Sequence, residues 1–340
     1  MKSHLKKATS FVVASIAALI ISTSAGLAGQ WNMPTPYPAG SFHTQNIQQF
    51  AEEITAATDG AISIVVHPAG SLVKHAEIKN AVRSGQVQIG EFLLSRLSNE
   101  NPIFEADALP FLAASYEDSR KLWRVQRKLI AEVLANQRLT VLYAVPWPPQ
   151  GIYTNSVVND ITDLSGMRFR TYNAAKERLA QLAGAVPTQI EVPDIPQAFS
   201  TGRVQGMITS STTGVNAKAW DFLDHYYDTR AFLPKNVIVV NTRALEALTT
   251  EQRNAVFAAA ARAEERGWEM SREETSVQTR ALGENGITVS DPSPSLRRAL
   301  NEIGEKMAAE WAARAGSSGA ILLDEFRKMQ LTLNSDTHTD

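Results

Sequence analysis

Short β-branched segments alternate with longer amphipathic segments along most of this chain, and this alternation constrains the fold more than any other feature. Strands are expected near residues 30–33, 61–66, 87–92, 140–145, 166–172, 204–208 and 236–240. Helices are expected between them, near residues 41–60, 74–84, 122–135, 174–184 and 194–201. Strands that alternate with helices at this rhythm predict an α/β protein with largely parallel sheets.

The segment that follows Thr249 predicts one long helix. Thr249 and Gln252 have the spacing of a capping box, and the helical pattern continues to about Leu282. Roughly 33 residues at about 1.5 Å each extend about 50 Å, which exceeds the width of one small domain. We therefore expect this helix to span two domains, for which a chain of 340 residues is long enough.

The first 28 residues have the pattern of an export signal. Three lysines precede an apolar stretch from Phe11 to Ile21, and small residues follow as far as Ala28. The apolar stretch is short for a bilayer crossing, which takes about 20 residues. We therefore predict cleavage after Ala28 and a periplasmic protein, with an uncleaved membrane anchor as the alternative.

The composition excludes several classes of function. The chain has no cysteine and a formal net charge of -2, so we expect no thiol nucleophile, zinc finger, disulfide framework or nucleic-acid-binding surface. None of the six histidines pair at metal-ligand spacing, and the common nucleotide-binding and serine hydrolase motifs are absent from the sequence. We therefore predict no metal, no cofactor and no catalytic residue. An exported hydrolase with scattered catalytic residues is an open alternative.

Two arginines in one predicted strand are the strongest functional candidates. Arg168 and Arg170 are two residues apart, so their side chains lie on the same face of the strand, and Phe169 lies on the other. A guanidinium group inside a covered sheet is costly unless an anion pairs with it. The pattern therefore indicates an anion-binding site, with a structural salt bridge or an exposed edge strand as the alternative.

The two arginines belong to a longer motif, Asp163–Arg170, which reads D-L-S-G-M-R-F-R. Four further motifs precede it, at residues 58–64, 67–72, 84–90 and 109–112, and one follows it, at residues 201–206. Together and in this order they resemble the solute-binding proteins of TRAP (tripartite ATP-independent periplasmic) transporters, of the DctP type. One departure is Gln205, which stands where that family usually has aspartate.

This resemblance implies a two-lobed periplasmic solute-binding fold of the α/β class, of the Venus-flytrap type, with the long helix between the lobes. Lobe I is expected to contain residues 29–148 and 236–275, lobe II residues 149–235 and 276–330, and residues 331–340 a flexible tail.

In function, the resemblance implies a protein that binds a small carboxylate between the lobes and performs no chemistry. It would deliver the ligand to membrane permease subunits for uptake driven by an ion gradient, with a monomer favoured and no nucleic acid as partner. A solute-binding protein of an ATP-driven importer has a similar layout and is the alternative.

The resemblance also assigns roles to residues. Arg170 takes the place of the arginine that forms a two-pronged salt bridge with the ligand carboxylate, and Asn173 takes the place of a ligand-binding asparagine. Arg168 is expected to point away from the ligand or to support the loop. Further candidates come from the segments that line the cleft in the family: Glu91, Phe92, Thr209, Ser210 and Ser211.

Three more candidates, Tyr37, Trp147 and Gln150, come from side chains around these segments. Tyr37, Trp147 and Phe92 can stack on a flat ligand, with core packing as the alternative for each. Gln150 stands where sialic-acid binders of the family have another arginine, so sialic acid is not expected. Hydroxy or oxo acids, sugar acids and aromatic acids all remain open as ligands.

Overall fold

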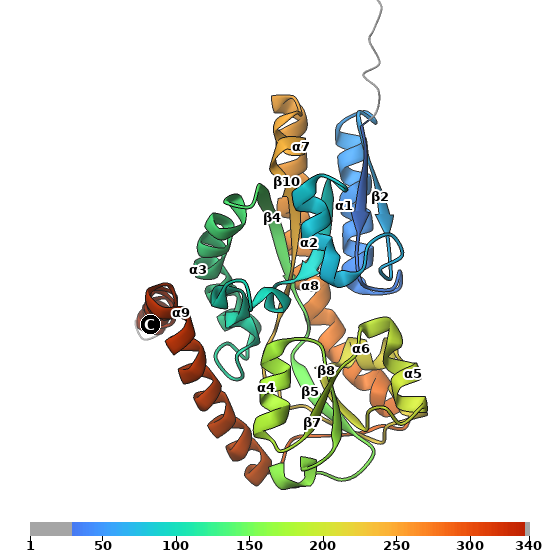
Figure 1. The fold of residues 1–340 in the computed structure, drawn as a ribbon, viewed down its shortest axis with the longest axis vertical. Coiled ribbons are helices and arrows are strands. Elements are labelled where there is room, and N and C mark those ends of the chain that lie inside the picture. Colours follow the sequence, from blue (N-terminus) through green and yellow to red (C-terminus); the bar gives the residue numbers. More distant parts are fainter. Residues whose placement is uncertain (1–28, 337–340) are drawn as a thin grey trace, which may run out of the picture.

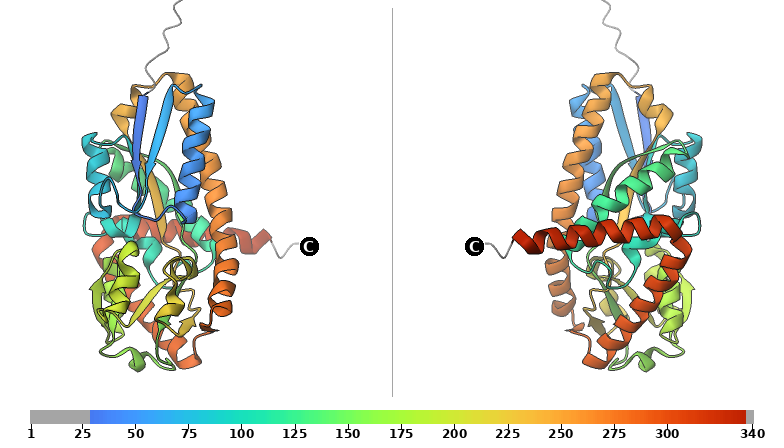
Figure 2. Two further views of the ribbon diagram at one scale, coloured as in Figure 1. Left: turned by 90° about the vertical axis from the view of Figure 1, so that its right-hand side faces the viewer. Right: turned by 90° about the vertical axis from the view of Figure 1, so that its left-hand side faces the viewer.

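The computed structural model describes residues 29–336, with side chains through residue 331, and the predicted export signal lies outside this range. The described chain forms two α/β lobes, one above the other in Figure 1 and called here the upper and the lower lobe. One long helix runs along both lobes, and the C-terminal helix, red in the figures, crosses the side that faces the viewer in the right-hand view of Figure 2.

The upper lobe contains a parallel sheet of β1 and β2 and an antiparallel sheet of order β3-β10-β4. Its strands are β1 (Gly29–Pro34), β2 (Ile62–His67), β3 (Ile89–Leu93), β4 (Leu139–Pro146) and β10 (Lys235–Asn241). Its helices are α1 (Phe42–Ala57), α2 (His75–Ser84), η1 (Leu94–Leu97), η2 (Pro102–Ala108), α3 (Tyr116–Ala135) and α7 (Thr242–Glu246). Helix α3 begins six residues before the expected 122 because Ser115 caps it by accepting a hydrogen bond from the Asp118 N–H.

The lower lobe is built on one six-stranded sheet of order β11-β9-β5-β8-β6-β7. Its strands are β5 (Gln150–Thr154), β6 (Arg168–Thr171), β7 (Val186–Gln189), β8 (Gly206–Ser210), β9 (His225–Tyr227) and β11 (Thr288–Ser290). Its helices are η3 (Ile161–Leu164), α4 (Ala174–Leu182), η4 (Val192–Asp194), α5 (Ile195–Ser200), α6 (Ser211–Asn216) and η5 (Ala219–Asp221).

Parallel and antiparallel pairings are equally common among these strands, so the prediction of largely parallel sheets was wrong. Strand β10 runs antiparallel to β3 and β4, and β5 runs antiparallel to β8 and β9. The chain descends from β4 to β5 and returns from β9 to β10, and hydrogen bonds join the two passages, including one of 2.8 Å from the Trp147 N–H to the Pro234 carbonyl. Because the passages run in opposite directions, the strands at their ends pair antiparallel, which the strand–helix rhythm does not indicate.

Helix α8 (Thr250–Glu284) spans both lobes, as predicted. The Gln252 N–H donates to the Thr249 hydroxyl and the Thr249 N–H donates to the Gln252 side chain, so the predicted capping box is present. Ala259 and Ala263 pack in the core of the upper lobe, whereas Leu282 packs in the core of the lower lobe.

Helix α9 (Pro294–Asp336) bends at Gly316, whose backbone has a positive φ of 55°. Its first part packs on the lower lobe through Leu296 and Leu300, and Trp311 and Phe326 join the upper core. The helix therefore holds both lobes, and it continues through residues 331–336, where a flexible tail was expected. Within residues 29–336, no helix combines the length and the apolar character that a membrane crossing takes.

Candidate functional site

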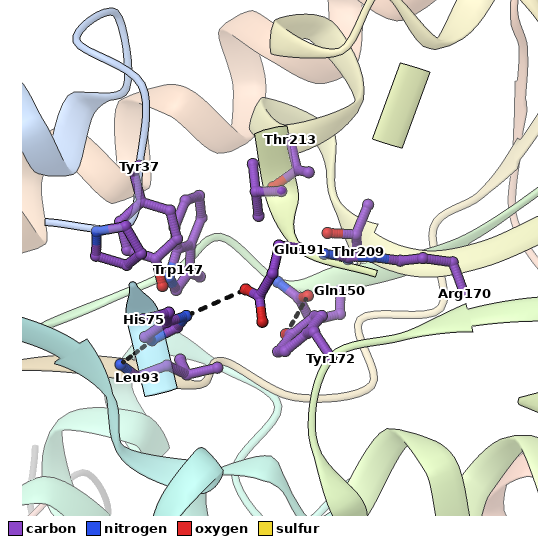
Figure 3. A pocket seen from close by; sticks show the side chains of 12 residues that line it. Tyr37, His75, Leu93, Trp147, Gln150, Arg170, Tyr172, Glu191, Thr209 and Thr213 are labelled. Carbon is purple, nitrogen blue, oxygen red and sulfur yellow. Dashed lines mark hydrogen bonds and ion pairs between the residues drawn. The ribbon is translucent and has the colours of Figure 1, made fainter. Parts of the chain in front are cut away.

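A pocket lies where the chain crosses between the lobes, with about 400 Å³ of empty space (Figure 3). Residues from both lobes line it: Pro36, Tyr37, His75, Leu93 and Trp147 on the upper side, and Gln150, Arg170, Tyr172, Glu191, Val192, Thr209 and Thr213 on the lower side.

Arg170 is the most deeply buried charged group of this pocket, with an exposed fraction of 0%. Its Nε donates to the Ile190 carbonyl at 3.0 Å, but Nη1 and Nη2 have no hydrogen-bond partner. Burial lowers the pKa of Arg170 to about 10, so the group remains charged at neutral pH. A buried guanidinium with two free donors is costly, and a carboxylate in the pocket would satisfy both donors.

The position of β6 removes the two alternatives considered for its arginines. The strand lies between β7 and β8, so it is not an edge strand, and the free Nη atoms show that Arg170 is in no salt bridge. Arg168 is exposed, and its Nε donates to the Gly202 carbonyl at 3.0 Å. The two side chains therefore differ sharply in environment although they share one strand.

A second buried cation, Lys176 of α4, lies beside the pocket. Its Nζ donates to Gln150 Oε1 at 2.7 Å and to the Ile208 carbonyl at 3.0 Å, and it lies 3.5 Å from the ring centre of Tyr172. Burial, assisted by the charge of Arg170, lowers the pKa of Lys176 well below its usual value. These contacts involve no carboxylate, so Lys176, like Arg170, has no carboxylate as a hydrogen-bond partner.

Lys176 also fixes the orientation of the Gln150 amide. Gln150 Oε1 accepts from both Lys176 and the Tyr172 hydroxyl, the latter at 3.2 Å, while Nε2 donates to the Pro148 carbonyl at 2.7 Å. Because the oxygen is occupied, the hydrogen-bonding capacity that Gln150 retains is its second N–H. Gln150 therefore serves the pocket as a donor.

The upper wall of the pocket is aromatic. The rings of Tyr37 and Trp147 meet edge to face, with centres 4.9 Å apart. Asn236 Oδ1 accepts from the Tyr37 hydroxyl at 3.0 Å and from Trp147 Nε1 at 3.1 Å, and its amide donates to Glu91 at 2.9 Å. Burial alone would raise the pKa of Glu91, but the nearby His43 and the hydrogen bonds that Glu91 accepts lower its pKa. The ionised Glu91 binds Asn236, which in turn holds the Tyr37 and Trp147 side chains in place.

The structure places the ten sequence candidates in two groups. Five line the pocket: Tyr37, Trp147, Gln150, Arg170 and Thr209. The other five lie near it but make different contacts, and a role in ligand contact stays a prediction for all ten. Glu91 binds Asn236, Phe92 packs in the upper core, Asn173 donates to Ser95 of the upper lobe at 2.7 Å, Ser210 caps α6, and Ser211 is buried in the first turn of α6.

The sequence analysis missed several residues that line the pocket, notably His75, Tyr172 and Glu191. Tyr172 directly follows the Arg170 strand, so its position was a usable signal. His75 and Glu191 are far apart in sequence and meet only in the fold. Among the described residues, no group of three or more His, Asp or Glu side chains is placed to hold a metal ion.

Residues 35–314 match the DctP family, described as bacterial extracellular solute-binding protein, family 7. The chain belongs to this family. The resemblance seen in the sequence motifs is confirmed, and with it the assignment to the solute-binding proteins of TRAP transporters.

Three solved structures of solute receptors are 38% to 46% identical to this chain. DctP7 of Bordetella pertussis, a receptor described as binding pyroglutamic acid, is 46% identical, with a TM-score of 0.87 over 88% of this chain and 100% of its own. DctP6 of the same organism, also described as binding pyroglutamic acid, is 38% identical, with a TM-score of 0.87 over 88% and 99%. A marine metagenome TRAP solute-binding protein described as specific for pyroglutamate is 38% identical, with a TM-score of 0.86 over 88% and 98%.

Among curated sequences, a solute-binding protein of Albidiferax ferrireducens is 26% identical over 180 residues, which are 52% of this chain. This match spans about half of that relative, 53% of its length.

For this TRAP solute-binding protein, Lys176 gives a prediction on pH. An unfolded lysine has a pKa of about 10.4, and the folded value lies below it. Between the two values the unfolded chain binds more protons, so the free energy of unfolding rises with pH. We expect Lys176→Met to flatten this rise at pH values below about 10.4 in denaturant titrations of the ligand-free protein. Exposed Lys74→Met is the control, and equal slopes for all three proteins would contradict the assignment.

Proposed function

We propose that this protein is the periplasmic solute-binding component of a TRAP transporter and that its ligand is pyroglutamate, the cyclic lactam of glutamate. The observation that carries the proposal is Arg170, which is buried and has two free Nη donors at a small pocket between the lobes. The three related receptors, 38% to 46% identical, are described as binding or specific for this compound.

The pocket offers a partner for each part of this ligand. The carboxylate would accept two parallel hydrogen bonds from Arg170. The lactam carbonyl would accept from the Thr209 hydroxyl or from the free N–H of Gln150. The methylene groups of the ring would pack against Trp147 and Tyr37, which present apolar surface to the pocket. The ten residues predicted from the sequence are proposed as the site and its immediate support.

The proposed mechanism is closure of the two lobes around the ligand. The lobes meet at the crossover segments, and Asn173 of the lower lobe bonds to Ser95 of the upper lobe. A bound carboxylate would neutralise Arg170, so it would stabilise the closed arrangement. We propose that the lobes divide near residues 148, 235 and 275, that the protein is monomeric and performs no chemistry, and that the closed form is recognised by the membrane permease. We also propose removal of residues 1–28 on export.

The proposal is tested by thermal denaturation and calorimetric titration of the mature protein with pyroglutamate. A ligand that binds only the folded state at 1,000 times its dissociation constant adds about 4 kcal/mol to the free energy of unfolding, which raises the melting temperature by several degrees. Cyclopentanecarboxylate keeps the ring and the carboxylate but lacks the lactam, so it should bind more weakly. The proposal fails if pyroglutamate gives no shift while a sugar acid or an aromatic acid does.

A further inference from the structure

A carboxylate, Glu191, lines the same pocket as Arg170. It lies just before η4 in the lower lobe, and its side chain reaches into the middle of the pocket (Figure 3). The side chain is 37% exposed. Because both terminal nitrogens of Arg170 are free, Glu191 does not pair with that guanidinium. The pocket thus holds one positive and one negative group that make no hydrogen bond with each other.

Two side chains of the upper lobe fix the position of Glu191. Arg96 Nη1 lies 2.9 Å from Oε1, and His75 Nδ1 lies 3.4 Å from Oε2. The His75 ring is itself oriented, because its Nε2 accepts from the Leu93 N–H at 3.2 Å. The hydrogen of the neutral ring therefore sits on Nδ1 and points at Glu191.

These contacts also fix the charge of Glu191. Partial burial alone would raise its pKa, but the hydrogen bond with His75 and the positive charge of Arg96 outweigh this effect and lower the pKa to about 2. Glu191 is therefore ionised at any pH that the protein meets in a living cell. Its two contacts use one acceptor position on each oxygen, and a carboxylate oxygen has two such positions.

We propose that Glu191 determines selectivity, by accepting a hydrogen bond from an N–H of the ligand and by excluding ligands that carry a second carboxylate. The proposal rests on the proposed function and deepens it. Arg170 takes one carboxylate, and a second negative charge in so small a pocket would lie close to Glu191. Like charges brought together across a binding surface are a strong source of specificity. Pyroglutamate has one carboxylate and a lactam N–H, so it suits both requirements.

The test compares pyroglutamate with glutarate, a diacid with the same number of carbon atoms. Calorimetry gives the dissociation constants of both for the wild type and for Glu191→Gln, which keeps the size of the side chain and removes its charge. We expect the preference for pyroglutamate over glutarate to fall at least tenfold in Glu191→Gln, about 1.4 kcal/mol. Glu302→Gln, an exposed change on α9, is the matched control and should keep the wild-type preference.

The ratio of the two constants separates selectivity from lobe closure. If Glu191 only helped to hold the lobes together, Glu191→Gln would weaken both ligands by the same factor, the ratio would stay within twofold of the wild type, and the inference would be overturned. A wild type that binds glutarate as tightly as pyroglutamate would also overturn it. If the wild type does not bind pyroglutamate but Glu191→Gln gains tenfold in glutarate affinity, the proposed ligand is wrong and the role of Glu191 stands.

Discussion

Arg170→Met is expected to weaken pyroglutamate binding by about 100-fold or more, because the carboxylate would lose two charge-assisted hydrogen bonds. Removing one partner of a buried charged pair costs about 2–5 kcal/mol, and each 1.4 kcal/mol is about tenfold in affinity. The stability of the ligand-free protein should respond differently. The change leaves the Ile190 carbonyl without its donor, but it also removes a buried charge that has no hydrogen-bonded counterion. We expect the free energy of unfolding to stay within about 1 kcal/mol of the wild type or to rise.

Calorimetric titration and denaturant unfolding of the same preparations measure both effects. Arg168→Met is the control: it removes an exposed arginine two residues away on β6 and should leave affinity within about twofold. Arg170→Lys keeps the charge but not the parallel pair of donors, so it should also lose most of the affinity. Normal binding by Arg170→Met would mean that the arginine has a structural role only.

The sequence singled out Arg170, which lines the pocket, because its signal is local. Two arginines separated by one residue in a strand, within a motif of eight residues, can be recognised without the fold. The lack of hydrogen-bond partners for its Nη atoms could not be predicted, because it depends on which distant side chains approach the strand. The same limit explains Glu191, whose partner His75 is 116 residues away in the chain.

Strand β3 shows a smaller error of the same origin. The motif that ends at Gly90 correctly indicated a segment near the pocket, and Glu91 and Phe92 were the expected contacts. Leu93, one residue further, is the member of β3 that lines the pocket. Glu91 instead binds Asn236 behind the aromatic wall, and Phe92 packs in the core on the other face. Alternation along a strand gives its two faces, but which position reaches a cavity depends on the element packed opposite.

The α/β class and the long helix were predicted correctly, but the strand directions were not. Helix α8 was predictable because its capping box and the absence of an early break can be recognised from neighbouring residues in the sequence. The antiparallel pairing of β10 with β4 and of β5 with β9 follows from the two crossovers, which are a property of the whole chain path. Sequence periodicity carries no information on that path.

Gly267→Ala is expected to destabilise the protein by at least about 2 kcal/mol, although alanine is the better helix former. Gly267 lies near the middle of α8, where the helix passes β4. An added Cβ would lie 2.4 Å from Val145 Cγ2 and 2.7 Å from the Asn46 amide nitrogen. Neither neighbour moves easily, because valine is branched at Cβ and the Asn46 amide donates to the Ala263 carbonyl at 2.9 Å. Helix propensity favours alanine by only about 0.5–1 kcal/mol, so the clash decides the sign.

The same helix offers a matched control, Gly283→Ala. A Cβ there would meet only Val289 Cγ2 at 3.9 Å, an ordinary contact, so this change should be neutral or stabilising by up to about 1 kcal/mol. Denaturant unfolding of both variants gives the comparison. Gly267→Ala should also weaken ligand binding, because Val145 leads through Pro146 directly into Trp147 of the pocket wall. If both glycines tolerate alanine equally, α8 does not pack against β4 as closely as described, and the proposed effect of this helix on ligand binding is contradicted.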